Sequence, residues 1–243
     1  MTIIQLSNLQ KHYNGKCILD INQLSIQPNE IVSLVGNNGA GKTTLLRIIL
    51  DLIRPDHGAV YIKDIPVLRQ TDWKYFTTSY LDESFLINYL TAEEYFYFIG
   101  KVYKRSQNDV DKALNLFEGF FAGEILNQRK YIRDFSKGNA QKIGIASCFI
   151  QQPELVLLDE PFANLDPTAR ENLKHIIRYF NDQKGTTMLI SSHDLSNVAA
   201  TAERIILMEK GKVISDTPRS EQAMQQVESY FASSAQTFNL QML

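Results

Sequence analysis

The sequence predicts an α/β fold with a mostly parallel sheet, an N-terminal antiparallel β subdomain and an inserted α-helical subdomain. Three observations support this prediction. β-like runs separated by turn signals fill the first part of the chain, residues 82–152 have helical patterns without a strong strand, and strands alternate with helices from Pro153 onward. Such alternation is typical of a parallel sheet, because parallel neighbours need a crossover connection, usually a helix.

The N-terminal segment has the pattern of antiparallel strands that lead into a buried strand and a helix. β-like runs at 3–6 and 18–26 flank Asn14-Gly15, a strong hairpin turn signal. Residues 30–35 are a short, mostly apolar run, typical of a buried strand, and the apolar spacing turns helical over 42–52.

The middle of the chain is predicted to be helical. Thr91-Ala92-Glu93-Glu94 has the form of a capping box, in which a Thr and a Glu satisfy the first backbone amides of a helix. Further helices are expected over 108–117 and 139–151. We therefore interpret this region as an inserted helical subdomain.

The last part of the chain returns to alternating strands and helices. The tail after Pro218 is expected to form one helix and then to fray. Strands are predicted over 155–158, 187–191, 205–208 and 213–214, and helices over 167–180 and 195–203.

Composition and charge exclude several classes of protein. Of the 243 residues, 44% are hydrophobic and 21% charged, as in ordinary globular proteins, which excludes a disordered chain, a collagen and a low-complexity linker. The net charge is −2, whereas proteins that coat DNA are usually basic, so no nucleic-acid partner is expected. Cys17 and Cys148 lie far apart and outside any CxxC pair, so both are expected to be small buried hydrophobes.

No stretch of the sequence is predicted to cross a membrane. A transmembrane helix needs about 18 consecutive apolar residues, and the best runs here, such as 31–35 and 205–208, are far shorter. The N-terminus also lacks a positive region followed by a long apolar core, so a secretory signal is not expected. We expect a soluble, cytoplasmic protein whose membrane role, if it has one, comes through a partner.

A phosphate-binding loop is predicted at residues 36–43. Their sequence, Gly-Asn-Asn-Gly-Ala-Gly-Lys-Thr, matches GxxxxGK[ST] in full, follows a predicted buried strand and opens a predicted helix. The glycines let backbone N–H groups curl around phosphate oxygens, and the positive end of the helix faces the same anion. Lys42 is expected to reach the β- and γ-phosphates, and Thr43 to ligate Mg²⁺ through its hydroxyl.

Two acids complete this site at the end of a predicted strand. Asp159 and Glu160 directly follow the apolar residues 155–158, at the carboxyl end of the strand, where open α/β sheets bind ligands. Asp159 is expected to hold Mg²⁺, directly or through water. Glu160 is placed to polarise an attacking water as a general base.

Further motifs resemble those of ATP-binding cassette (ABC) proteins. Phe135-Ser136-Lys137-Gly138-Asn139 resembles the signature motif, whose common form is LSGGQ, and lies just upstream of the acidic strand. Asn164-Leu165-Asp166 resembles the D-loop, Ser192-His193-Asp194 resembles the switch-histidine region, and Tyr13 matches the A-loop aromatic. The motifs follow the family's order over nearly the whole chain. The signature variant and the short helical insert resemble most the ATPases of ABC-2 type exporters.

The resemblance implies a P-loop NTPase (ABC ATPase) core with a mostly parallel sheet, an N-terminal antiparallel β subdomain and an inserted α-helical subdomain. It implies a single ABC ATPase domain over 1–243. Its parts would be a nucleotide-binding core at about 1–82 and 153–218, a helical subdomain at about 83–152 and a C-terminal helical tail at 219–243.

The family's residue roles carry over to matching positions, with ATP and Mg²⁺ as cofactors. Tyr13 would stack on adenine, and Thr43, Asp159 and Glu83 would hold the metal. Glu160 and His193 would hold the catalytic water, with Lys42 on the γ-phosphate. The phosphates would be surrounded by Gly36, Asn37, Asn38, Gly39, Ala40, Gly41, Lys42, Thr43 and Thr44 of one subunit, and contacted by Ser136, Lys137, Gly138, Asn139 and Asp166 of the other.

Three residues depart from the family's pattern. The family's Q-loop usually has Gln where the sheet meets the helical insert, but here Glu83 would take that role and would add negative charge near the phosphates. In the signature, Lys137 replaces a glycine and Asn139 replaces a glutamine. Lys137 adds a positive charge near the phosphate in the opposite subunit, and we hypothesise that it partly offsets Glu83.

The resemblance also implies partners. The chain has one phosphate loop and one signature, whereas each ATP in the family needs both, from opposite subunits. A dimer, most simply a homodimer, would therefore close around two ATP molecules. It would act on separate transmembrane permease subunits, which would hold the chain at the inner face of the cell membrane and would choose the substrate.

Other functions within the family compete with this one. Only 117 positions separate Lys42 from Asp159, which excludes the DNA-repair and chromosome types with their long insertions, and a single cassette excludes the translation-factor type. An iron–sulfur assembly ATPase stays open as the alternative. The intact Lys42, Asp159, Glu160 and His193 argue against a regulator that binds ATP without hydrolysing it.

The aromatic run Tyr95-Phe96-Tyr97-Phe98 allows two interpretations. One is a helix core in which Phe96 and Ile99 face inward. The other is a groove that receives a helix from a membrane partner, because exposed aromatic residues favour interfaces. Both stay open at this point, since the sequence alone does not show exposure.

Overall fold

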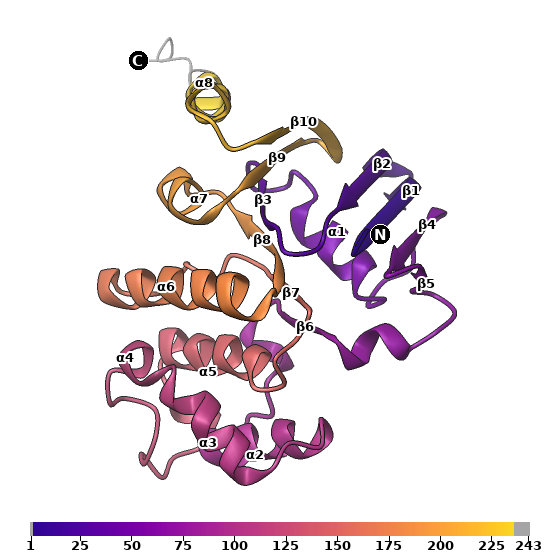
Figure 1. The fold of residues 1–243 in the computed structure, drawn as a ribbon. Helices are drawn as coiled ribbons and strands as arrows, with labels where there is room; N and C mark the ends of the chain where they lie inside the picture. The colour runs from indigo at the N-terminus through magenta and orange to yellow at the C-terminus, as the bar shows by residue number, and fades with distance from the viewer. Residues whose placement is uncertain (1, 236–243) are drawn as a thin grey trace.

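Two β-sheets and the helices around them build the fold, shown in Figure 1 as a computed structural model that describes residues 2–235. The antiparallel sheet lies to one side of the molecule, and helices α2–α5 gather at one end, below the parallel sheet in this view. The predicted α/β fold with a mostly parallel sheet, an antiparallel β subdomain and inserted helices is confirmed.

The first sheet is antiparallel and has the strand order β2-β1-β4-β5. Asn14 and Gly15 both take positive φ in the turn between β1 and β2, as the predicted hairpin requires. The strands are β1 (Ile4–Tyr13), β2 (Lys16–Ile26), β4 (His57–Ile62) and β5 (Ile65–Pro66).

The second sheet has the order β10-β9-β3-β8-β7-β6. All neighbours run parallel except β9 and β10, which form an antiparallel hairpin. Every residue of β3, β7 and β8 is buried, as expected for a parallel sheet covered on both faces. The strands are β3 (Ile31–Val35), β6 (Thr77–Tyr80), β7 (Leu155–Leu158), β8 (Thr187–Ser192), β9 (Arg204–Glu209) and β10 (Lys212–Pro218).

Strand β6 was not predicted from the sequence. Its residues, Thr-Thr-Ser-Tyr, are mostly polar, and it lies at the edge of the sheet with β7 as its partner. An edge strand has a neighbour on one side only, so it lacks the continuous apolar run that reveals a central strand.

Helices flank the parallel sheet and mostly follow the predicted ranges. α1 ends at Ile49 rather than at 52, because Asp51 adopts a positive φ of 54°. α6 runs past the predicted end to Lys184, where Gly185 ends it in the left-handed conformation. The helices are α1 (Lys42–Ile49), α6 (Pro167–Lys184), α7 (Leu195–Thr201) and α8 (Glu221–Ala235); the predicted fraying beyond α8 lies outside the described residues.

The inserted helices lie between β6 and β7 in the chain. The predicted capping box is present, since the Thr91 hydroxyl accepts from the Glu94 N–H and the Glu94 carboxylate accepts from the Thr91 N–H. The α-helices are α2 (Ala92–Val102), α3 (Gln107–Asn115), α4 (Glu118–Phe121) and α5 (Lys137–Phe149). Short 3₁₀ turns are η1 (Asp72–Tyr75), η2 (Glu83–Phe85) and η3 (Ile132–Asp134).

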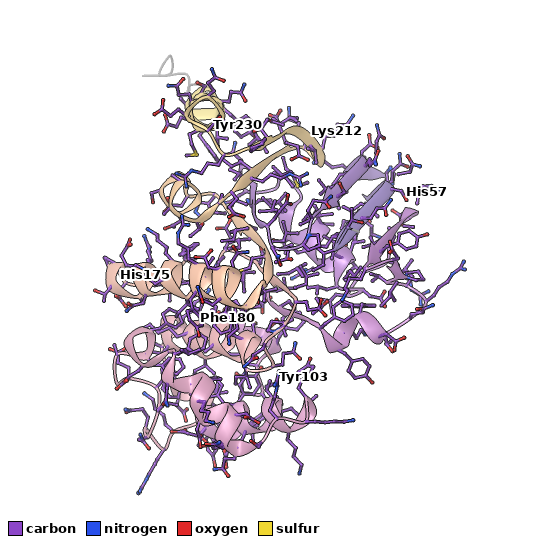
Figure 2. The ribbon with its side chains drawn as sticks, in the orientation of Figure 1. His57, Tyr103, His175, Phe180, Lys212 and Tyr230 are labelled. Carbon is purple, nitrogen blue, oxygen red and sulfur yellow. The ribbon has the colours of Figure 1, made fainter. Side chains whose placement is uncertain are left out.

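A cluster of aromatic rings joins the helical insert to the rest of the fold. Phe117, Phe149 and Phe180 are all buried, and the ring centroids of Phe149 and Phe180 lie 4.4 Å apart. Figure 2 labels Phe180, which comes from α6. Of the aromatic run on α2, Phe96 is fully buried, as the core interpretation expects, whereas Phe98 is 45% exposed.

Two further observations concern the cysteines and the membrane. Cys148 is buried as predicted, but Cys17 is exposed, because it follows the hairpin turn on edge strand β2; the expectation for Cys17 is corrected. Over residues 2–235, no helix combines the length and apolar character needed to cross a bilayer.

Candidate nucleotide-binding site

The phosphate loop connects β3 to α1 at the carboxyl edge of the parallel sheet. Two of its glycines are required by space or backbone conformation. A side chain at Gly36 would collide with the Met208 carbonyl, and Gly41 has a φ of 102°, in a region that L side chains rarely adopt. These features let the loop make the tight turn that a phosphate-binding loop needs ahead of α1.

A pocket of about 380 Å³ lies over this loop. Lys16 and Ile18, at the start of β2, form part of its wall, and Glu160 reaches it from the end of β7. The remaining lining is the loop itself: Asn37, Asn38, Gly39, Ala40, Gly41, Lys42, Thr43 and Thr44. Sequence reasoning placed the loop residues and Glu160 here but missed the cation Lys16.

Lys42 is only 6% exposed, and its ammonium lies between the loop backbone and an acid. Its Nζ donates a 2.6 Å hydrogen bond to the Gly36 carbonyl and lies 3.5 Å from Glu160 Oε1. A buried ammonium needs such partners to offset the loss of water.

Asp159 and Thr43 meet although they come from different motifs. Thr43 Oγ1 donates a 2.6 Å hydrogen bond to Asp159 Oδ2. Ser191, at the end of β8, donates to Asp159 Oδ1 and accepts from the Glu160 N–H at 2.9 Å. Ser191 was not predicted; its signal in the sequence was its place in the polar Ser191-Ser192-His193 run that ends an apolar strand.

Glu160 connects Lys42 to His193. Its Oε2 lies 2.8 Å from His193 Nδ1, while Oε1 faces Lys42. The Glu160 backbone has a φ of 47°, a left-handed conformation that costs a non-glycine residue about 1–3 kcal/mol. Such strain persists where the surrounding structure fixes it, and here the hydrogen bond from the Glu160 N–H to Ser191 does so.

These groups fit the phosphates of a nucleotide with Mg²⁺. A hydroxyl and a carboxylate oxygen lie side by side at Thr43 and Asp159, and Mg²⁺ prefers hard oxygen ligands of this kind together with substrate phosphates. The N-terminus of α1 and the Lys42 ammonium supply the positive potential that phosphate oxygens need.

Tyr13 lies beside the mouth of the pocket. It is the register partner of Lys16, which lines the pocket, and its ring is 46% exposed. Lys11 Nζ lies 5.2 Å from the ring centroid. Tyr13 is therefore partly exposed next to a pocket-lining residue, which fits a role in stacking on a base.

The signature residues do not line the phosphate pocket of their own chain. Ser136 caps α5, with its Oγ accepting from the Asn139 N–H at 3.2 Å. Gly138 lies so close to the D-loop that a Cβ there would come 2.7 Å from the Asn164 carbonyl oxygen. Signature and D-loop therefore pack together within one subunit, apart from the phosphate loop.

Asp166 caps α6 and has a further charged neighbour. Its Oδ1 accepts from the Ala169 N–H at 2.9 Å, and Oδ2 lies 3.7 Å from the buried Lys142 ammonium. The Ala169 amide, followed by the Lys142 charge, holds the pKa of Asp166 below its usual range.

Glu83 lies beside the signature helix. Its Oε1 is 3.2 Å from Lys137 Nζ, whereas its neighbour Asp82 faces Arg47 of α1 at 4.0 Å. Among the described residues, no contact joins Glu83 to Thr43 or Asp159. The predicted metal role of Glu83 is thus not matched by a direct contact with the other predicted ligands.

Helix α8 also reaches the phosphate loop. Asn37 Nδ2 lies 3.4 Å from the hydroxyl of Tyr230, which Figure 2 labels on α8. Burial raises the pKa of Tyr230, with a further contribution from Glu209. Sequence reasoning missed this contact, because no local pattern connects a tyrosine in the tail to a loop 193 positions away.

Together, the fold and this site define a P-loop nucleoside triphosphatase: a phosphate loop between strand and helix, with two acids at the end of a neighbouring parallel strand. Residues 19–163 match the ABC transporter family, and the chain belongs to that family.

Relatives and solved structures of ABC transporter ATP-binding proteins support this family membership. The chain is 32% identical over 222 residues to SkfE of Bacillus subtilis, the SkfA peptide export ATP-binding protein, covering 89% of each. It is 31% identical over 202 residues to the ABC transporter ATP-binding protein NatA of the same organism, covering 82% of this chain and 80% of NatA. A relative from Synechocystis is 33% identical over 79% of this chain, which spans about half, 54%, of that relative's length.

A solved dimer of a bacterial ABC transporter cassette has a TM-score of 0.78 and 28% identity, covering 89% of this chain and 99% of that one. The structure of an ATP-binding subunit of an ABC transporter has a TM-score of 0.84 over 96% of this chain and 99% of that one, at 24% identity, which shows the shared fold.

Proposed function

We propose that this chain is the ATP-hydrolysing subunit of an ABC transporter, with ATP held between two subunits and coupled to separate permease subunits. The observation that carries the proposal is the continuous arrangement of groups at one sheet edge. Thr43 contacts Asp159, and Glu160 contacts both Lys42 and His193. These contacts support a metal-binding pair and a general base beside the phosphate loop.

The residues of this chain would act as follows. Thr43 and Asp159 would hold Mg²⁺, which when bound neutralises phosphate charge and polarises the γ-phosphate. Lys42 would exchange the Gly36 carbonyl for phosphate oxygens. Glu160 would accept the proton of the attacking water, and His193 would orient the Glu160 carboxylate.

The second half of each site would come from another copy. The signature residues Ser136 and Lys137 lie at the N-terminus of α5 and do not line their own chain's pocket, so they are available to a nucleotide held elsewhere. The similar cassette structures that are dimers support this arrangement. Loss of the γ-phosphate after hydrolysis would remove the charge that joins the two subunits.

We also propose that a permease would dock on the helical part, at about 83–152, and would hold the chain at the inner face of the cell membrane. A pocket of about 350 Å³ lies where these helices meet the core, and it supports this step. Aromatic and aliphatic side chains such as Trp73, Phe85 and Tyr95 line it together with polar ones such as Lys74, Thr78 and Ser79. The transport functions that the relatives' names give, such as peptide export for SkfE, support the permease partner without identifying it.

Hydrolysis is tested by phosphate release from ATP with Mg²⁺. Glu160→Gln is expected to lower kcat by about 10²- to 10⁴-fold, the usual contribution of a general base, and Lys42→Ala is expected to weaken ATP binding. Lys63→Ala is the matched control, because it removes a lysine that pairs with Glu154 away from the pocket. Unchanged turnover in Glu160→Gln would overturn the assignment of the base.

The shared site is tested by mixing two inactive variants, Lys42→Ala and Ser136→Ala. A mixed dimer has one site with both Lys42 and Ser136 intact, so the mixture should show turnover that neither variant has alone. A mixture no more active than its parts would contradict the two-subunit site.

Permease docking is tested with Phe85→Asp, which replaces an aromatic ring of the pocket lining with a charge. In native cells, this variant should sediment less with the membrane fraction, while ATP turnover of the purified chain stays unchanged. Tyr89→Asp is the control, because Tyr89 is 73% exposed and does not line the pocket. Equal sedimentation of both variants would argue against docking there.

A further inference from the structure

The two main departures from the family's motifs lie in contact with each other. Glu83, where the family usually has glutamine, and Lys137, where the signature usually has glycine, form an ion pair of 3.2 Å within one subunit. The pair is open to water, since 39% of the Glu83 side chain and 60% of the Lys137 side chain are exposed. An exposed pair of this kind is weak enough to be exchanged for another partner.

The charge of Lys137 is unfavourable on its own at this place. Lys137 is the first residue of α5, where the helix end is already positive, and the first turn of α5 has no acid. The nearest carboxylate that compensates it comes from η2 instead. Glu83 thus supplies, from outside the helix, the negative charge that the α5 N-terminus favours.

The residues before and after Glu83 hold the segment 80–86 against two helices. Tyr80 and Leu86, which flank Glu83, pack on Gly144 of α5 so closely that a Cβ at Gly144 would collide with the Tyr80 ring. Asp82 caps η2 through the Ser84 N–H at 2.8 Å and faces Arg47 of α1, the helix that follows the phosphate loop. The segment therefore contacts both the helix of the chain's own phosphate loop and the signature helix.

We propose that Glu83 is an internal competitor for the anion site at the signature. In the single subunit, Lys137 pairs with the Glu83 carboxylate; when two subunits close, Lys137 exchanges this carboxylate for the γ-phosphate of the ATP bound to the partner subunit. The exchange raises the ATP concentration needed for closure. This inference rests on the proposed two-subunit site, and in it Glu83 acts through Lys137 rather than on the metal.

The experiment measures ATP-driven association by light scattering in the Glu160→Gln background, which blocks hydrolysis. Adding Glu83→Gln should lower the ATP concentration for half-maximal association by about two- to tenfold, because each dimer breaks two exposed ion pairs. Lys137→Gln should raise that concentration. In the Lys137→Gln background, Glu83→Gln should have no further effect, because its partner is already absent.

Two controls accompany these variants. Glu154→Gln removes an acid from another exposed ion pair, with Lys63 at 2.8 Å, before the start of β7 and thus at the opposite end of that strand from Asp159; it should leave association unchanged. Binding of a fluorescent ATP analogue to the single subunit, measured across Mg²⁺ concentrations, should be the same with and without the Glu83→Gln substitution.

The outcomes separate the possible failures. If Glu83→Gln alters the Mg²⁺ dependence of binding in the single subunit, or still shifts association in the Lys137→Gln background, Glu83 acts on its own site and the competition is wrong. If the Glu160→Gln parent associates with ATP but Glu83→Gln does not shift it, the competition alone is wrong. If the parent does not associate at all, the two-subunit site and the competition both fail.

Discussion

The hydroxyl of Thr43 donates a 2.6 Å hydrogen bond to Asp159 Oδ2 across 116 positions of sequence. This contact brings the end of the phosphate loop against the end of β7, so two oxygen ligands suited to Mg²⁺ lie together. The same acid is held from its other oxygen by Ser191 of β8. The site is thus organised by three neighbouring elements of one rigid sheet edge.

Thr43→Val should make ATP binding less dependent on Mg²⁺. The substitution keeps the size of the side chain and removes the oxygen that faces Asp159. We expect ATP affinity in the presence of Mg²⁺ to fall by about tenfold or more, as for loss of a charge-assisted contact, and affinity in EDTA to change little. Titration with a fluorescent ATP analogue measures both. Thr78→Val, which removes a hydroxyl bonded to the Cys148 carbonyl, is the control; an equal loss in EDTA would contradict the metal role.

Ser191→Ala should lower ATP turnover, because Ser191 positions both Asp159 and Glu160. Its hydroxyl bonds both the Asp159 carboxylate and the Glu160 N–H, so its loss leaves both acids less well oriented. We expect kcat to fall by about tenfold with a raised Mg²⁺ requirement, while the fold survives. A steady-state assay across Mg²⁺ concentrations distinguishes this from simple destabilisation. Ser147→Ala removes a buried serine bonded to a backbone carbonyl in α5, and should leave the Mg²⁺ requirement unchanged.

Gly138→Ala should separate the signature helix from the D-loop. The added Cβ would lie 2.7 Å from the Asn164 carbonyl oxygen, so the backbone must move. Overpacking of this kind costs about 1–3 kcal/mol, and we expect urea unfolding to show a loss in that range together with weaker ATP-driven association. Gly119→Ala on α4 meets nothing closer than 3.8 Å and is the matched control. Equal stability of the two variants would contradict the packing described here.

Asp166→Ala should destabilise the chain through α6, whereas Asp166→Asn should keep most of the cap. Loss of an N-cap costs about 1 kcal/mol, measured by urea unfolding at pH 7. Because the pKa of Asp166 is lowered in the folded chain, its charge stabilises fully above the ordinary carboxyl pKa of 3.8, and this contribution is lost as pH falls through the lowered pKa. The difference in free energy of unfolding between the natural Asp166 and Asp166→Asn should therefore shrink as pH falls below 3.8 toward the lowered pKa. If the two proteins differ in unfolding free energy by the same amount at every pH, the charge of Asp166 contributes nothing to stability.

The parts of the fold and site that could be predicted are those that depend on residues close together in the sequence. The buried strands β3 and β7 are apolar runs that end in glycine or acids, so both the sheet edge and the groups on it could be inferred. Strand β6 was missed because its mostly polar residues gain their strand structure from pairing with β7. The strand is recognised only from its pairing with β7 in the folded sheet.

Contacts between distant side chains could not be predicted in the same way. The Glu83–Lys137 pair depends on how η2 packs against α5, and the Asn37–Tyr230 contact on how α8 docks beside the loop. The sequence suggested that the charges of Glu83 and Lys137 offset each other, but as residues that opposite subunits contribute to one ATP site. The structure instead joins them within one subunit, which changes the mechanism that they suggest.

The most direct test of the central claim is the mass of purified Glu160→Gln protein, measured by light scattering with and without ATP and Mg²⁺. The substitution should keep binding and block hydrolysis, so the closed state accumulates. The account predicts a monomer that becomes a dimer only when ATP and Mg²⁺ are both present. A chain that binds ATP but keeps its monomer mass would contradict a site completed by a second copy of this chain.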